Sequence, residues 1–307
     1  MMKNNRLHKG FALVILSAIL FGTTGTTKAL APEEISSTVI GSLRLIIGGP
    51  ALLLMLTAFG KTRLRTFRPP ILPTLVAAAG IVMFQLCFFE AVTRTGVALG
   101  TIVAICIAPV ISGLLGAVFQ KEQLTRNWLI ASVLAISGCI ILTVAGSDLK
   151  IDTTGIFLAV AAGLGYAVSL VGSKTVVANH SPVLSIAVIL CVGAVLVFPR
   201  LMMEDLSPVG TGHGLAVVLY LGLVATAASY LLLAKGLSVI PVSRTALLML
   251  VEPLTGSLLG VLLLGEVFTP FSGVGSLLIF SGLVVIAFDR EKPAPTAPLA
   301  ANGQKTD

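Results

Sequence analysis

The stretch PVISGLLGAVFQKEQLTRNWLIASVLAISG (residues 109–138) returns in related form as PLTGSLLGVLLLGEVFTPFSGVGSLLIFSG (residues 253–282). The matching residues include Pro109, Gly116, Glu122, Thr125, Ser137 and Gly138, which recur as Pro253, Gly260, Glu266, Thr269, Ser281 and Gly282. Every pair is 144 residues apart, so the two copies align without a gap. Both copies lie in strongly apolar sequence. The chain therefore contains an internal repeat whose unit belongs in a membrane.

The composition excludes an ordinary soluble domain. The 307 residues have a mean hydropathy of +1.04, and 56% are apolar while only 11% are charged. The net charge of +7 does not indicate nucleic-acid binding, because the basic residues lie in short loops between apolar runs. The cysteines stand singly in apolar segments, which favours a core role over disulfides or metal ligation: Cys87, Cys106, Cys139 and Cys191.

Apolar runs predict ten membrane-spanning helices, since a bilayer core needs about 20 apolar residues per helix. The predicted spans are 11–30, 38–58, 71–92, 97–119, 127–145, 155–173, 183–201, 212–234, 243–263 and 270–289. Ten spans in two halves give five per half. An odd number makes the second half enter the membrane upside down, so the predicted fold is all-α and integral to the membrane, with two inverted five-helix repeats.

The distribution of basic residues predicts that both termini are cytoplasmic. With that orientation, 14 of the 20 basic residues fall in inner segments, and only Arg94, Lys150 and Arg200 fall in outer loops. The predicted organisation is a cytoplasmic segment at 1–10, repeats at 11–145 and 155–289, and a disordered cytoplasmic tail at 290–307. The first apolar run is too long for a typical cleaved signal, so it is expected to remain as a span.

The ten spans, the five-plus-five duplication and the paired Pro…Glu-x-x-Thr…Ser-Gly pattern resemble the EamA-type proteins of the drug/metabolite transporter superfamily. The resemblance rests on Phe21-Gly22, on Pro109 with Glu122, and on Glu252-Pro253 with Glu266. Within that group the chain looks most like bacterial amino-acid exporters. It departs from a common Trp-Gly beginning, since it has Phe21-Gly22. The resemblance implies secondary transport by alternating access.

Glu252 is the deepest predicted charge, near the middle of a span and directly before Pro253. Charge at this depth costs about 3 kcal/mol or more. Pro253 is expected to kink the helix. Glu252 is interpreted as a proton carrier or counter-ion for a substrate ammonium, or as a carboxylate bonded for packing. Arg244 differs from it by about 80° around the helix axis, so it is expected to attract a substrate carboxylate, to pair with Glu252, or to extend to the interface.

Three other charges are expected toward the outer ends of their spans: Arg44, Glu90 and Lys28. Arg44 and Glu90 form an outer gate if they face each other, and otherwise reach separate lipid headgroups. Lys28 lies at the same level. Uncharged side chains are the remaining candidates for the transport pathway: Gln85, Thr226, Ser229, Tyr230, Thr23 and Thr27. The two threonines fit tight helix packing as well as a wet cavity.

The repeated residues are expected to be structural. Gly256 and Gly260 form a GxxxG element that is mirrored at 112–116, which predicts close approach of spans 4 and 9 or a dimer seam. Pro109 and Pro253 are expected to be hinges. Glu122 and Glu266 precede Thr125 and Thr269, which are expected to cap spans 5 and 10.

The predicted function is a secondary transporter that exports small polar metabolites, amino acids first, across a bacterial plasma membrane. Other metabolites, drugs or nucleotide-type substrates are alternatives, and so are a membrane enzyme and a non-transporting scaffold. The chain has no phosphate-binding Gly-x-x-x-x-Gly-Lys motif and no metalloprotease or hydrolase motif, so no cofactor, metal or enzymatic activity is expected. Protons and a second copy of the chain are possible partners.

Overall fold

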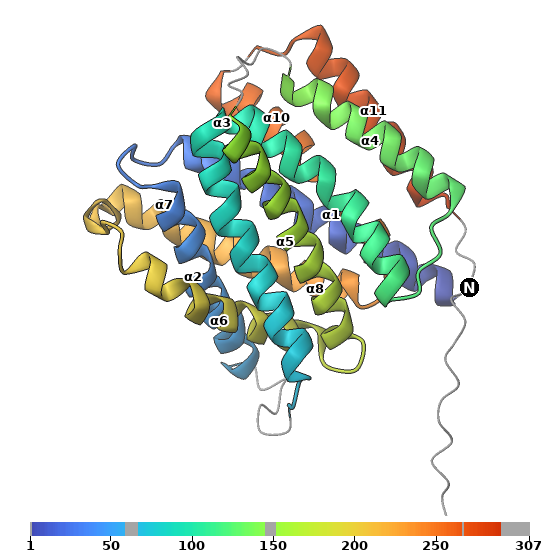
Figure 1. Cartoon of the computed structure of the whole chain (residues 1–307), viewed down its shortest axis with the longest axis horizontal. Coiled ribbons are helices and arrows are strands. Elements are labelled where there is room, and N and C mark those ends of the chain that lie inside the picture. The colour runs from blue at the N-terminus through green and yellow to red at the C-terminus, as the bar shows by residue number, and fades with distance from the viewer. Residues whose placement is uncertain (1, 59–66, 145–151, 266, 290–307) are drawn as a thin grey trace, which may run out of the picture.

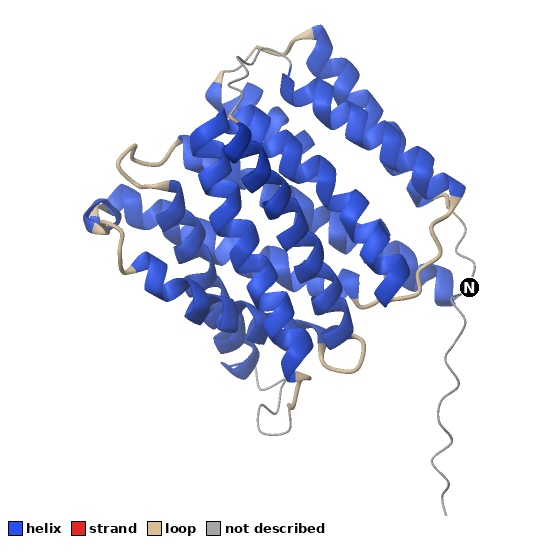
Figure 2. Cartoon of the chain, in the orientation of Figure 1, coloured by secondary structure: helices blue, strands red, loops and turns tan. Residues whose placement is uncertain are grey.

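The structure is a computed structural model that describes residues 2–58, 67–144, 152–265 and 267–289. Within these ranges every regular element is a helix, and Figure 2 shows helices joined by short loops. Glu266, which is expected to be a structural residue, and the predicted tail at 290–307 lie outside the described residues. In the described part of the chain, ten helical segments are long and apolar enough to cross a membrane. The prediction of ten spans is confirmed.

The elements follow the chain in order: α1 Met2–Ala29, α2 Ser37–Ala58, α3 Ile71–Phe119, α4 Arg126–Val144, α5 Thr153–Val177, α6 Pro182–Leu201, η2 Ser207–Gly210, α7 Gly212–Gly222, η3 Leu223–Ala228, α8 Ser229–Leu237, α9 Val242–Leu248, α10 Val251–Leu264 and α11 Pro270–Ala287. Helix α3 contains spans 3 and 4. Span 8 consists of α7, η3 and α8, and span 9 consists of α9 and α10.

Spans 3 and 4 meet at Gly96, whose φ of 80° interrupts α3. Only glycine adopts this backbone conformation without steric cost, so a very short connection joins the two spans here. Pro109 lies inside α3 without such an interruption. Span 8 contains a π-helical turn at Leu223–Ala228, and span 9 is interrupted between Leu248 and Val251. The π-helical turn lies at the middle of span 8, and the interruption lies in the first half of span 9. Broken helices of this kind commonly form functional sites in membrane transporters.

Helices α4 and α11 contact each other so closely that a Cβ at Gly138 would lie 2.6 Å from the Gly275 carbonyl oxygen. The residue 144 positions after Gly138 is Gly282, and the residue 144 positions before Gly275 is Ala131. A Cβ at Gly282 would lie 2.8 Å from the Ala131 carbonyl oxygen. The same contact is therefore made twice with the halves exchanged, as a twofold relationship between the repeats requires.

The pair α4 and α11 lies along one edge of the molecule, beside the bundle formed by the other helices (Figure 1). Large apolar side chains on this pair are exposed, among them Leu129, Val133, Leu277 and Phe280. Exposed leucine and phenylalanine along a span are the surface that lipid tails cover. The remaining spans enclose the polar residues described next.

Candidate functional site

Arg44 of α2 lies where the two halves meet and is only 7% exposed. Its Nε donates a hydrogen bond to Thr226 Oγ1 at 3.1 Å, and its Nη2 donates to the Ala225 carbonyl at 3.5 Å. Both acceptors belong to η3 in the second half. The guanidinium carbon also lies 5.8 Å from the ring centroid of Phe21, a cation–π contact. The π-helical turn thus supplies the polar contacts of a buried cation.

Glu252, in the first turn of α10, interacts electrostatically with Arg44. No ion pair of 4.0 Å or less joins the two side chains, so they share one polar region without direct contact. The break between α9 and α10 has a local cause. Pro253 has no N–H for the Met249 carbonyl, and that carbonyl accepts a hydrogen bond from the Glu252 N–H at 2.9 Å instead.

The Phe21-Gly22 pair brings α1 into this region. The ring of Phe21 packs edge-on against Tyr230 of α8, with centroids 5.1 Å apart and an interplanar angle of 89°. A Cβ on Gly22 would lie 2.7 Å from the Glu252 carbonyl oxygen and 2.5 Å from Thr255 Cβ. Only glycine at position 22 allows α10 to approach this closely. One residue of the motif therefore contacts Arg44 and the other positions the backbone of Glu252.

A small cavity lies beyond Tyr230. Its polar lining consists of Tyr166, Ser169 and Ser173 of α5 together with Tyr230, and leucine and isoleucine side chains complete it. The Tyr166 hydroxyl is fully buried and has no hydrogen-bond partner. A buried hydroxyl without a partner has a free-energy cost that a bound water or ligand would remove. Tyr166, Ser169 and Ser173 were not among the predicted site residues.

Some of the uncharged candidates lie in the polar region around Arg44, and others make hydrogen bonds within their own helix. Thr226 contacts Arg44, and the Ser229 carbonyl accepts a hydrogen bond from Ser17 Oγ at 2.8 Å. Thr23 and Thr27 donate to carbonyls of their own helix, at 2.7 Å and 2.9 Å. Gln85 is buried in α3.

The outer gate, which was one of two alternatives for Arg44 and Glu90, is not formed. Glu90 makes an exposed ion pair with Arg94 at 2.7 Å, one helical turn away. Arg44 is instead bonded to η3, far enough inside that it is almost completely buried. Lys28 donates to the Ser37 hydroxyl and lies 5.8 Å from the Phe89 ring centroid. Of the two alternatives, a contact between Arg44 and Glu90 is therefore not formed, because the side chain of Arg44 turns toward span 8.

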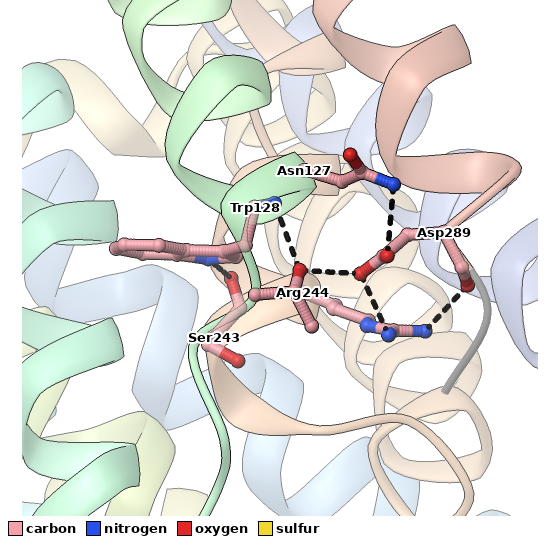
Figure 3. Close-up of polar contacts among 6 residues, drawn as sticks. Asn127, Trp128, Ser243, Arg244 and Asp289 are labelled. Atoms are coloured by element: carbon pink, nitrogen blue, oxygen red, sulfur yellow. Dashed lines mark hydrogen bonds and ion pairs between the residues drawn. The ribbon is translucent and has the colours of Figure 1, made fainter. Parts of the chain in front are cut away.

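Arg244 is also placed differently from the expectation. Its Nη2 forms a 2.9 Å ion pair with Asp289 Oδ2, and the two side chains are 7% and 5% exposed. Asp289 also accepts hydrogen bonds from Thr125 Oγ1 at 2.7 Å and from Asn127 Nδ2 at 3.1 Å. Figure 3 shows this cluster, in which Trp128 Nε1 donates to the Ser243 carbonyl at 3.2 Å. Arg244 therefore pairs with Asp289 and not with Glu252.

The repeated glutamate Glu122 caps the start of α9. Its two carboxylate oxygens accept hydrogen bonds from the backbone N–H groups of Val242 and Ser243, at 2.5 Å and 2.9 Å. Gly116 makes room for it, since a Cβ there would lie 2.7 Å from Glu122 Oε2. We call Glu122, Thr125, Asn127, Trp128, Ser243, Arg244 and Asp289 the α9 anchor cluster.

The threonines before spans 5 and 10 cap these helices as predicted. Thr125 Oγ1 accepts from the Trp128 N–H at 3.0 Å, and Thr269 Oγ1 accepts from the Ser272 N–H at 3.1 Å. Of the two expectations for the GxxxG element, the structure tests only the close approach of spans 4 and 9, and it does not show that approach. A Cβ on Gly256 would lie 3.7 Å from the Gly22 carbonyl oxygen, so α10 approaches α1 and not span 4. Gly260 is buried on the same helix.

Comparison with known proteins identifies the fold and its function class. The model of the EamA-like transporter family matches the chain twice, at residues 8–144 and 153–288. The chain belongs to the EamA-like transporter family. The EamA-like chain is therefore a multi-pass membrane transporter and not an enzyme. Its substrate is a small molecule, and the lipid bilayer surrounds it.

Two relatives and one solved structure show how far the likeness extends. An uncharacterized transporter of Bacillus subtilis, YwfM, is 40% identical over 274 residues, which cover 89% of this chain and 92% of the relative. A protein of Streptantibioticus cattleyicolor named as a probable terminal-alkyne amino-acid exporter is 31% identical over 185 residues, which cover 59% of this chain and 61% of the relative. A crystal structure with a TM-score of 0.80 and 18% identity covers 90% of this EamA-like chain and 95% of its own, and shows the same fold.

Proposed function

We propose that this EamA-like protein is a secondary transporter that exports small polar metabolites across a bacterial plasma membrane by alternating access. Amino acids are the first candidates for its substrate. The observation that carries the proposal is the polar region between the halves. Arg44 comes from the first half and Glu252 from the second. The Phe21-Gly22 pair joins them, since the Phe21 ring lies 5.8 Å from the Arg44 guanidinium and Gly22 packs against the backbone of Glu252. A positive and a negative side chain in one membrane-buried site can bind the carboxylate and the ammonium group of a zwitterion.

Other features support the same proposal. The Phe21 and Tyr230 rings, the Thr226 hydroxyl and the cavity beside Tyr166 offer apolar surface together with a few polar groups, the usual lining of a small-molecule site. The relative named as a probable terminal-alkyne amino-acid exporter supports the substrate class. The basic residues in loops 59–70 and 120–125 favour a cytoplasmic position for these loops and for both termini.

The proposal is tested by flux in proteoliposomes that contain the purified protein. A panel of labelled amino acids is measured with and without a pH gradient, and protein-free liposomes serve as the control. Saturable uptake or counterflow of at least one amino acid supports the proposal. If the panel gives no protein-dependent flux while a nucleotide sugar or a drug does, the substrate class is wrong; if nothing moves, a scaffold is favoured.

A further inference from the structure

The guanidinium of Arg44 has donors that the protein does not use. An arginine carries five N–H donors, and the hydrogen bonds of Arg44 involve Nε and Nη2. Nη1 has no partner among the described residues. It is also not one of the fully enclosed atoms without a partner. Nη1 therefore has unused donors and some accessible surface in an otherwise buried residue.

Among the described residues, no carboxylate contacts this cation. Carboxylates that lie within the described residues are engaged elsewhere: Glu90 with Arg94, Glu204 with Arg200, Asp289 with Arg244, and Glu122 with the amides of α9. Glu252 interacts with Arg44 only at longer range. A buried guanidinium without a contacting anion is strongly destabilising. Such a group is retained where a ligand supplies the missing charge.

We propose that Arg44 binds the carboxylate of the substrate through its free Nη1 edge, and that Thr226 and Phe21 hold the guanidinium in position for it. The guanidinium fork matches a carboxylate in two parallel hydrogen bonds, which an ammonium group cannot reproduce. The ammonium of the substrate then lies toward Glu252. This inference rests on the proposed function, because it assigns an orientation to an amino acid in the same site. It replaces Arg244, which is paired with Asp289, as the carboxylate-binding residue.

The first test uses the wild-type protein and therefore does not depend on the folding of a variant. Counterflow of an amino acid that the transporter exchanges is measured in proteoliposomes against three unlabelled competitors: the same amino acid, its α-amide, and the amine that lacks the carboxylate. The amide and the amine should compete at least about 10-fold more weakly than the acid, the usual effect of losing a charged hydrogen bond. Equal competition by all three overturns the inference.

The second test compares Arg44→Gln and Arg44→Lys with Arg94→Gln, which removes an exposed arginine of the same chain. Arg44→Gln should lose the preference for acid over amide, while Arg44→Lys should keep part of it because the charge remains. Arg94→Gln should keep the wild-type preference. A folded Arg44→Gln protein that still prefers the acid contradicts the assignment.

The two proposals fail differently. If the wild-type protein exchanges no amino acid, the proposed substrate class falls and the carboxylate site falls with it. If amino acids are exchanged but the amide competes as well as the acid, only the role of Arg44 is wrong.

Discussion

Arg244 and Asp289 are 45 residues apart in the chain and form a 2.9 Å ion pair whose side chains are almost completely buried. The pair joins the first turn of span 9 to the end of span 10, and Thr125 and Asn127 at the start of span 5 complete the coordination of the carboxylate. The edge pair α4 and α11 is thereby attached to the bundle at one end (Figure 3).

Asp289→Asn should destabilise the protein by about 3–5 kcal/mol, because it leaves the guanidinium of Arg244 buried without a counter-charge. Thermal unfolding in detergent measures the effect. The control is Glu90→Gln, which removes one member of a pair whose side chains are 45% and 49% exposed. That change should cost about 0–1 kcal/mol. Equal shifts of the unfolding temperature for the two variants would show that the buried pair stabilises the protein no more than the exposed pair does.

Gly22→Ala should destabilise the packing of α1 against α10 by about 1–3 kcal/mol, since the added methyl group meets atoms at 2.5 Å and 2.7 Å. Transport should fall with it, because Glu252 and Phe21 are displaced. Gly25→Ala on the same helix is the matched control, as its Cβ would meet nothing within 4 Å. Gly25→Ala should be neutral or slightly stabilising. Wild-type transport and stability in Gly22→Ala would contradict the contact.

Glu252→Gln should abolish flux that a pH gradient drives and leave part of the substrate exchange intact, if Glu252 carries the proton. Exchange needs the site but no net proton movement, whereas gradient-driven flux needs a titrating group. Proteoliposomes with and without the gradient separate the two activities, and Glu90→Gln again serves as the control. Equal loss of both activities, or no loss of either, counts against proton coupling through Glu252.

Glu122→Gln should expose the start of α9 to faster amide exchange, because one of the two carboxylate acceptors becomes a donor. The loss of a charged cap costs about 1–2 kcal/mol. Hydrogen–deuterium exchange should rise at Val242 and Ser243. Asp152→Asn is the control: Asp152 caps α5 through the Gly155 N–H at 2.6 Å, so its effect should stay within α5. If amide exchange at the start of α9 is unchanged in Glu122→Gln, the capping role of Glu122 is contradicted.

Labelling from outside the cell tests the orientation. In a protein without native cysteines, single cysteines replace Arg68 and Asp205, which are both exposed. A membrane-impermeant maleimide applied to intact cells should label Asp205→Cys and leave Arg68→Cys unlabelled until the membrane is opened. The reverse pattern would invert the proposed topology, and labelling of both would reject the arrangement of spans.

The ten spans were predictable because each is an apolar run bounded by polar residues, proline or glycine. The local irregularities were only partly predictable. Pro253 indicated the break in span 9, and the break follows from its missing N–H. The π-helical turn at Leu223–Ala228 has no such signal, since the apolar run continues through it.

The partners of charged residues were the part that sequence could not supply. Arg244 and Glu252 were placed on one polar face by assuming a continuous helix, but the break after Leu248 removes the constant rotation per residue on which that estimate depends. Arg44 was assigned to an outer position by its distance along span 2. Its environment depends instead on which way the helix faces, and that is decided by contacts with residues about 180 positions away.

Span 8 carries a wider turn than a regular α-helix, so it accommodates a residue beyond the number its length would otherwise require. Deleting a single residue from this turn would convert it to a regular α-helical turn, because the extra residue is what widens it. The flanking residues would keep their directions, so Tyr230 would stay beside the ring of Phe21. The turn itself would change, and with it the Ala225 carbonyl and the Thr226 hydroxyl that accept hydrogen bonds from Arg44. The length of the chain at this point therefore matters for Arg44 and not for the placement of Tyr230.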